Sequence, residues 1–336
     1  MPLHSHIPLA YMRSIGLCLL FSFVAQGVAA QAPARHADTL ATAEIRRQLD
    51  QLSAATSVYA VHPASGRTAD VRADMPMNTM STIKIAIMLL GYRDAEAGRL
   101  NLDERITLRE EDRRGGTGML KRFGPGMAVT YRDLIDQMII TSDNTATEAL
   151  TVRLGFDRIN AMLRELGFRE TRLVLTISQF FRNLSAIGAP ERAAWSDAQI
   201  FRAPAVAGPD LAAKRFAFAV DSATWLGRTT ARETTTLLEG IYLAKYTSAA
   251  SSAAMMGHLF GQFYNTRLPA TLRYRSGVRI AHKTGDFPPT SGSDVGIIEY
   301  PGGPLFISVY TNANRGDFGQ LELTIGKVAE LLVNRW

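Results

Sequence analysis

The spacing of apolar residues predicts sheet-forming segments at both ends of the chain and a helical middle. An early segment, 41–52, repeats apolar residues at helical spacing. Alternating patterns then predict two strands, 57–62 and 68–71, joined by a surface turn. Three more strands and a last helix are expected near the end of the chain, at 278–283, 294–300, 305–312 and 321–333.

The middle of the chain has a mostly helical pattern from about residue 101 to residue 167. Thr130 and Asp133 resemble a capping box that begins a helix at 134–140. Prolines interrupt 168–228, and its apolar residues lack a sustained period, so this stretch predicts no regular element. Further helices are expected at 145–154, 157–166, 233–246 and 251–263.

The order of these elements predicts an α+β fold. Strands at both ends, without regular alternation with helices, argue against a doubly wound parallel sheet. They suit one antiparallel sheet built from both chain ends with flanking helices, plus an all-helical lobe. We expect a sheet lobe of about 41–80 and 247–336 and a helical lobe of about 81–246, with an insertion at about 182–228. Both lobes would belong to a single domain, 31–336, and a cleft between lobes is a preferred place for a small-molecule site.

The first thirty residues have the pattern of a secretory signal peptide. Arg13 is their only Lys or Arg, an apolar segment follows at 15–24, and small residues precede Gln31. Cys18, the only cysteine, lies inside this segment, so the mature protein is expected to lack disulfides and cysteine metal sites. The predicted location is secreted or periplasmic, with no membrane segment after removal of the signal.

Composition narrows the kinds of partner. A hydrophobic fraction of 46% and a charged fraction of 20% are typical of a globular protein. The net charge of +6 comes from scattered Lys and Arg residues, which argues against a nucleic-acid partner. Four histidines lack the spacing of metal ligands, so no metal or other cofactor is expected: His36, His62, His258 and His282. A monomer is expected.

The stretch 80–90 predicts a helix that is apolar almost all round yet carries Lys84 near its start. Ser81 lies three residues earlier on the same helical face. A lysine made less basic by burial can remove the proton of a serine hydroxyl and activate it as a nucleophile. The alternative is a capping serine followed by a lysine that reaches out to solvent.

Two more polar clusters lie far away in the sequence. Ser142-Asp143-Asn144, between two predicted helices, offers a hydroxyl, a carboxylate and an amide. Lys283-Thr284-Gly285 ends a predicted strand and offers an ammonium, a hydroxyl and a glycine that allows close backbone approach. Each cluster alone is also ordinary turn or strand-end chemistry.

Taken together, Ser-x-x-Lys, Ser-Asp-Asn and Lys-Thr-Gly in this order resemble the class A β-lactamase family and the penicillin-binding proteins. The resemblance extends over about 41–336 and includes the stretches 115–118 and 129–134. It implies a β-lactamase/transpeptidase-like fold and a serine nucleophile.

The resemblance also implies a role for each matching residue. Ser81 would be acylated, Lys84 would act as base or proton relay, and Ser142 would pass a proton to the leaving nitrogen. The other matches would bind the substrate: Asn144 its side-chain amide, Lys283, Thr284 and Gly285 its carboxylate region, and Asp286 the oxyanion, through its backbone N–H together with that of Ser81.

The chain departs from the family at the Ω-loop, where the family carries a glutamate that activates the deacylating water. An ungapped count places Ile177 there, and no Asp or Glu lies between Glu170 and Glu191. Gln179 and Asn183 reproduce the family's spacing two residues later, but an amide cannot take up a proton near neutral pH. Other candidate bases are Glu191, Asp197, Asp210 and Asp221.

A second departure lies beyond the Lys-Thr-Gly motif. Asp286 stands where the family has a small residue, and its carboxylate would repel an anionic substrate if it pointed inward. The family's usual cation is missing a little further on, and three arginines are candidates to replace it: Arg273, Arg275 and Arg279.

These features predict an exported serine acyl-hydrolase of the class A β-lactamase type, acylated at Ser81 by a β-lactam. Since no deacylation base is recognisable, slow deacylation and turnover through another base both stay open. A D-alanyl peptidase or esterase of the same fold, and a penicillin-binding or sensing protein without turnover, are the alternatives. The expected partner is a β-lactam or cell-wall peptide.

Overall fold

A six-stranded sheet forms one half of the protein in a computed structural model that describes residues 33–208 and 210–336. The strand order is β1-β3-β2-β11-β10-β9, antiparallel except for the β1–β3 pair. The strands are β1 (His36–Ala37), β2 (Ala55–His62), β3 (Arg67–Val71), β9 (Arg279–Phe287), β10 (Ser291–Tyr300) and β11 (Gly303–Asn312). The predicted sheet built from both chain ends is confirmed. The predicted signal peptide, 1–30, lies outside the described residues.

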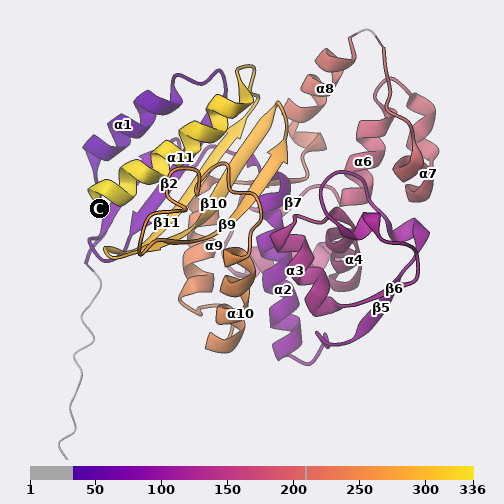
Figure 1. Cartoon of the computed structure of the whole chain (residues 1–336), viewed down its shortest axis with the longest axis horizontal. Helices are drawn as coiled ribbons and strands as arrows, with labels where there is room; N and C mark the ends of the chain where they lie inside the picture. The colour runs from indigo at the N-terminus through magenta and orange to yellow at the C-terminus, as the bar shows by residue number, and fades with distance from the viewer. Residues whose placement is uncertain (1–32, 209) are drawn as a thin grey trace, which may run out of the picture. The chain divides into compact units, whose positions relative to one another are not determined.

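Helices cover both faces of this sheet. α1 (Thr39–Leu49) and α11 (Phe318–Arg335) lie side by side across one face (Figure 1). Successive side chains of a strand point to opposite faces, so Val58 packs in the core beneath α1 and α11, whereas Tyr59 packs in the core that contains α9 (Ala231–Tyr242). α9 contacts β2, β10 and β11, and α10 (Ala249–Phe260) contacts β9.

The other half of the protein is mainly helical. Its helices include α2 (Lys84–Glu96), α3 (Tyr131–Ile140), α4 (Asn144–Leu154) and α5 (Phe156–Glu165). The capping box predicted for α3 is present, because Thr130 and Asp133 each accept a hydrogen bond from the other's backbone N–H. Two small sheets that the sequence pattern does not predict also lie here: β5 (Arg105–Leu108) with β6 (Met127–Thr130), and β4 (Met77–Asn78) with β8 (Gly227–Thr229) and β7 (Arg172–Leu173).

The segment without predicted elements is itself largely helical. It contains α6 (Ile177–Ala186), α7 (Asp197–Arg202) and α8 (Leu211–Val220), which gather at one end of the molecule (Figure 1). The Asp197 carboxylate accepts hydrogen bonds from Arg114 Nη2 at 2.8 Å, Arg182 Nη2 at 2.8 Å and Ser178 Oγ at 3.0 Å. These contacts fasten α7 to the body of the protein. Across the described ranges 33–208 and 210–336, no helix has the length and apolar character needed to span a membrane.

Candidate active site

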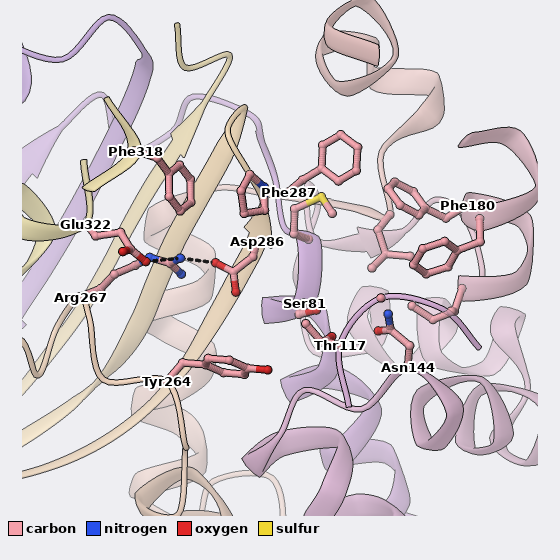
Figure 2. A pocket seen from close by; sticks show the side chains of 16 residues that line it. Ser81, Thr117, Asn144, Phe180, Tyr264, Arg267, Asp286, Phe287, Phe318 and Glu322 are labelled. Carbon is pink, nitrogen blue, oxygen red and sulfur yellow. Dashed lines mark hydrogen bonds and ion pairs between the residues drawn. The ribbon is translucent and has the colours of Figure 1, made fainter. Parts of the chain in front are cut away.

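Ser81 lies in a 3₁₀ turn, Met80–Ile83, that runs directly into α2 at Lys84. The sequence pattern predicts a continuous helix here, so the tighter first turn is a correction. Met80 adopts a left-handed backbone conformation with φ 43°, and Asn78 Oδ1 accepts a hydrogen bond from its N–H at 3.0 Å. The turn presents the Ser81 side chain to a cavity, as Figure 2 shows.

Strand β9 lies directly against this turn, and Gly285 makes the close approach possible. A Cβ atom at residue 285 would come within 2.4 Å of the Thr79 carbonyl oxygen and 3.4 Å of the Met80 Cβ. Any larger residue would therefore push the strand away from the nucleophile turn. The glycine of the Lys-Thr-Gly motif thus brings the Asp286 backbone to the edge of the Ser81 cavity, where the resemblance places an oxyanion donor.

A buried polar cluster lies behind Ser81. Lys84 Nζ lies 2.7 Å from the Ser142 carbonyl oxygen, 2.9 Å from Asn144 Oδ1 and 3.2 Å from Ser142 Oγ. Lys283 Nζ donates to the same Ser142 Oγ at 3.0 Å. Lys84 and Lys283, which lie 58 and 141 residues from Ser142 in the sequence, therefore meet at its hydroxyl group.

Burial changes the basicity of both lysines. Burial, and then the neighbouring Lys283, holds the pKa of Lys84 well below its ordinary 10.5. Burial lowers the pKa of Lys283 from 10.5 to about 8. A neutral Lys84 keeps two N–H groups, enough for the Ser142 carbonyl and Asn144 Oδ1, and one lone pair. This amine can accept a proton, as a general base requires.

The glycine-rich stretch 115–118 holds the Ser-Asp-Asn segment in place. Asn144 Nδ2 donates to the Gly115 carbonyl at 2.9 Å, and Thr117 Oγ1 donates to the Ser142 carbonyl at 2.6 Å. A Cβ at Gly116, where φ is +77°, would lie 2.6 Å from Asn144 Nδ2. Ser142 itself has φ 55°, a conformation that disfavours non-glycine residues, and these contacts stabilise it.

The central residue of that segment has a structural role. Asp143 Oδ1 caps α4 by accepting from the Ala146 N–H at 2.9 Å, and its other oxygen accepts from the Leu120 N–H at 2.8 Å. Ser142 and Asn144 therefore remain as the groups that contact Lys84.

The cavity in front of Ser81 has a volume of about 490 Å³. Figure 2 shows Arg267, Glu322, Phe318 and Tyr264 on one side of the cavity and Phe180 and Asn144 on the other. Of the site residues predicted from the sequence, three line the cavity: Ser81, Asn144 and Asp286. Four others are buried behind it: Lys84, Ser142, Lys283 and Thr284.

The structure corrects the assignment of Gln179 and Asn183 to the deacylation site. Both side chains are exposed, and the Gln179 amide oxygen caps α6 by accepting from the Thr176 N–H at 2.9 Å. Ile177, Phe180 and Phe181 line the cavity instead. Residues three and four apart share one face of a helix, so the face that carries Ile177 points inward and the Gln179–Asn183 face points outward.

None of the four alternative carboxylates lines the cavity. Asp197 pairs with Arg114 and Arg182, and Asp221 caps the short turn that follows α8. Glu191 and Asp210 are exposed. The candidate bases named from the sequence are therefore placed elsewhere.

Arg267 is the arginine that lines the cavity, in place of the three predicted from the sequence. Its side chain is 4% exposed and pairs with Asp286 and with Glu322 of α11, whose Oε1 lies 2.9 Å from Arg267 Nη2. The predicted arginines lie outside this lining: Arg273 stacks on Tyr274, Arg275 contacts Asn334, and Arg279 pairs with Glu299. Arg267 and Glu322 belong to no recognisable motif, and reasoning from the sequence missed both.

Within the part of the chain that the structure describes, no histidine lines this cavity. His282 Nδ1 lies 2.9 Å from Asp294 Oδ1, and His258 lies between Asp136 and Tyr92 at 2.8 Å from each. Among residues 33–208 and 210–336, no group of three or more His, Cys, Asp or Glu side chains is arranged to hold a metal ion.

The lowered pKa of Lys283 predicts that the protein becomes more stable between about pH 8 and pH 10. The unfolded lysine keeps its proton up to its ordinary pKa of 10.5, whereas the folded lysine loses it near 8. The unfolded state therefore holds more protons in this interval, and the free energy of unfolding rises with pH, by at most about 1.4 kcal/mol per pH unit. Urea unfolding at pH 8, 9 and 10 measures the slope. Lys283→Met is expected to reduce this slope and leave the part that comes from Lys84, whose pKa is also lowered. A wild-type stability that falls over this interval would contradict the assignment.

Ser81 lies at the cavity and the buried Lys84 follows it by three residues, an arrangement expected of a serine hydrolase-like enzyme. The chain belongs to the beta-lactamase enzyme family, whose model matches residues 40–336. The match spans both lobes, and together with the fold it makes the protein a class A beta-lactamase-like serine hydrolase.

Solved structures share this fold at low sequence identity. A beta-lactamase from Sphaerobacter thermophilus has a TM-score of 0.69 at 24% identity, with 88% of this chain and 96% of that chain covered. An ancestral class A beta-lactamase has a TM-score of 0.70 at 23% identity, covering 88% and 100%. PBP-A has a TM-score of 0.69 at 22% identity, covering 90% and 98%. The fold is therefore similar to those of both beta-lactamases and PBP-A.

Proposed function

We propose that the protein is an exported serine acyl-hydrolase that is acylated at Ser81 by β-lactams and releases the acyl group slowly. The main support is the polar cluster behind Ser81, in which Lys84 and Lys283 both contact the Ser142 hydroxyl. Export is supported by the signal-peptide pattern of residues 1–30.

Acylation begins when Ser81 Oγ attacks the lactam carbonyl carbon and its proton passes to the neutral Lys84 amine. The backbone N–H groups of Ser81 and Asp286 stabilise the oxyanion that forms. The carbon–nitrogen bond then breaks, and the Ser142 hydroxyl gives its proton to the leaving nitrogen. The protonated Lys84 restores the Ser142 proton across 3.2 Å. The net change moves the Ser81 proton to the leaving group and joins the acyl group to Ser81.

Deacylation needs a water molecule and a group that takes its proton. The wall formed by Ile177, Phe180, Phe181 and Leu226 offers no such group. The only carboxylates among the described residues lining the cavity, Asp286 and Glu322, are paired with Arg267. We infer that the acyl-enzyme persists.

The same wall favours a second candidate function, that of a penicillin-binding protein or D-alanyl peptidase that passes the acyl group to an acceptor other than water. An apolar wall protects an acyl-enzyme from hydrolysis until such an acceptor arrives. One solved variant of PBP-A, a protein of this fold, is an acyl-enzyme complex with penicillin-G.

Intact-mass spectrometry after incubation with penicillin G tests the proposal. We expect the mass of the protein to rise by one whole penicillin molecule, because ring opening loses no atoms, and the adduct to persist after removal of free drug. Ser81→Ala is expected to give no adduct. Ser53→Ala, which removes a hydroxyl from an exposed residue outside the cavity lining, serves as the matched control. Equal labelling of Ser81→Ala would overturn the proposal.

A further inference from the structure

A second cavity, of about 440 Å³, adjoins the Ser81 cavity. Gly116, Thr117 and Tyr264 line both cavities, so these residues form the border between them. Figure 2 shows the Tyr264 ring extending toward Ser81, with its hydroxyl group foremost. The other residues that line the second cavity, which we call the side cavity, lie beyond this border: Gly118, Met119, Lys121, Arg122, Thr141 and Phe263. A ligand of the Ser81 cavity therefore has a neighbouring space into which it can extend.

Both walls of the side cavity are fastened to the end of α3 and the segment that follows it. On one wall, the Asp143 carboxylate accepts a hydrogen bond from the Leu120 N–H at 2.8 Å and thereby holds the short turn Leu120–Arg122. On the other wall, the Phe263 N–H donates to the Ile140 carbonyl at 3.0 Å. The two walls are therefore held in place from the same segment, as a preformed binding site requires.

Two cations line the side cavity without a negative partner. In the described part of the chain, no carboxylate lines this cavity, and none lies within ion-pair distance of the Lys121 or Arg122 side chain. Arg113, a few residues earlier in the chain, does have such a partner, since it pairs with Glu110 at 3.1 Å. Burial lowers the pKa of Lys121 from its ordinary 10.5, as expected of an ammonium group partly removed from water. An anionic group of a ligand would supply the missing partner.

The side cavity lies on the side of Ser81 from which the leaving nitrogen is protonated. Ser142 gives this proton in the proposed acylation, and its chain neighbour Thr141 lines the side cavity. Thr117, at the border of the two cavities, donates to the Ser142 carbonyl at 2.6 Å. A donor that extends past its leaving nitrogen would therefore pass Thr117 and enter the side cavity.

We propose that the side cavity binds an anionic group attached beyond the leaving nitrogen, so that the protein prefers acyl donors with a second carboxylate there. The inference rests on the proposed acylation of Ser81 and specifies its substrate class. Lys121 and Arg122 donate charge-assisted hydrogen bonds to this carboxylate. Met119 and Phe263, which are 47% and 71% exposed, cover the chain that carries it. The carboxylate next to the reacting amide keeps the place that the Lys-Thr-Gly motif gives it.

The extra contact leaves the chemical steps of acylation unchanged. Ser81 Oγ forms the bond to the carbonyl carbon, the carbon–nitrogen bond breaks, and the Ser142 hydroxyl protonates the nitrogen. The second carboxylate takes no part in these steps and keeps its charge. Because it strengthens binding of the donor, the rate of acylation rises most at donor concentrations below saturation.

Three cephalosporins that differ at a single end group test this preference. Each carries a phenylacetamido side chain and the usual carboxylate, and a propyl chain on the ring that contains the leaving nitrogen ends in a carboxylate, a carboxamide or an ammonium group. The rate of Ser81 acylation below saturation, followed by intact mass, is expected to be about threefold to tenfold higher for the carboxylate-ended donor than for the carboxamide-ended donor. The ammonium-ended donor is expected to be slowest, and about 1 M salt is expected to weaken the preference.

Two double variants show whether the preference comes from these cations. Lys121→Gln combined with Arg122→Gln is expected to react at nearly equal rates with the carboxylate-ended and carboxamide-ended donors. Arg46→Gln combined with Arg47→Gln removes two neighbouring charges from α1, outside both cavities, and is expected to keep the wild-type ratio of rates. Since each result is a ratio measured within one protein, a partial loss of folded protein does not affect it.

Equal rates with the carboxylate-ended and carboxamide-ended donors in the wild-type protein would overturn the role of the side cavity and leave the acylation of Ser81 intact. A preference that survives in the variant with both Lys121→Gln and Arg122→Gln would overturn the assignment to these residues. Failure of all three donors and of penicillin G to label Ser81 would overturn the proposed function itself.

Discussion

Replacing Lys84 with methionine is expected to slow the acylation of Ser81 by penicillin G by about 10²–10⁴-fold, the range that general-base catalysis contributes. Methionine keeps the approximate length and apolar stem of lysine but has no amine to accept the serine proton. The polar contacts to the Ser142 carbonyl and Asn144 Oδ1 are lost as well. The rate constant of adduct formation, taken from intact masses over time, measures the effect.

Lys327→Met on α11 is the matched control for this experiment, because Lys327 is exposed and lies outside the cavity lining. It is expected to acylate at the wild-type rate. Thermal unfolding of Lys84→Met shows whether the variant is folded, since the unpaired acceptors cost about 1–3 kcal/mol while removal of a buried amine offsets part of this loss. A folded variant that acylates at the wild-type rate would show that Lys84 is not the base.

Replacing Ile177 with glutamate is expected to convert a single acylation event into turnover. In stopped-flow measurements with a chromogenic cephalosporin, the wild-type protein is expected to give a burst of one equivalent followed by almost no further reaction. Ile177 lines the Ser81 cavity and occupies the first position of α6. A glutamate there interacts favourably with the helix N-terminus and presents a carboxylate that can accept a proton from water.

We expect the steady rate after the burst to rise by about 10²-fold or more in Ile177→Glu, as general-base catalysis allows. Ile177→Gln has the same size and polarity without a basic group, so it is expected to keep the wild-type behaviour. If the two variants behave alike, the missing carboxylate is not what limits deacylation. Rapid steady turnover by the wild-type protein would show that another base exists.

The fold could be predicted from the sequence where the period of apolar residues is sustained. The predicted strands 57–62 and 305–312 nearly coincide with β2 and β11. Their pattern is long, because the two faces of each strand pack in two different hydrophobic cores. Helices at 177–186 and 211–220 are not predicted, because prolines at 190, 204 and 209 interrupt the stretch that contains them. Short strands such as β4 and β7, with two residues each, carry no periodic signal.

The residues of the candidate site also fall into those that the sequence could predict and those that it could not. Ser81, Ser142 and Lys283 could be named because each lies in a short motif whose internal spacing is set by the chemistry. Arg267 and Glu322 could not, since they meet only through the folding of a loop against α11. The assignment of Gln179 and Asn183 to the deacylation site was wrong because it relied on their spacing along the chain. In the structure both residues lie on the exposed face of α6.

The mass of the protein after exposure to penicillin G, followed by peptide mapping, tests the central claim most directly. The account predicts one penicillin-sized adduct per chain, carried by the peptide that contains Ser81, persistent after removal of free drug and absent from Ser81→Ala. An adduct on any other residue, or wild-type labelling of Ser81→Ala, would contradict it.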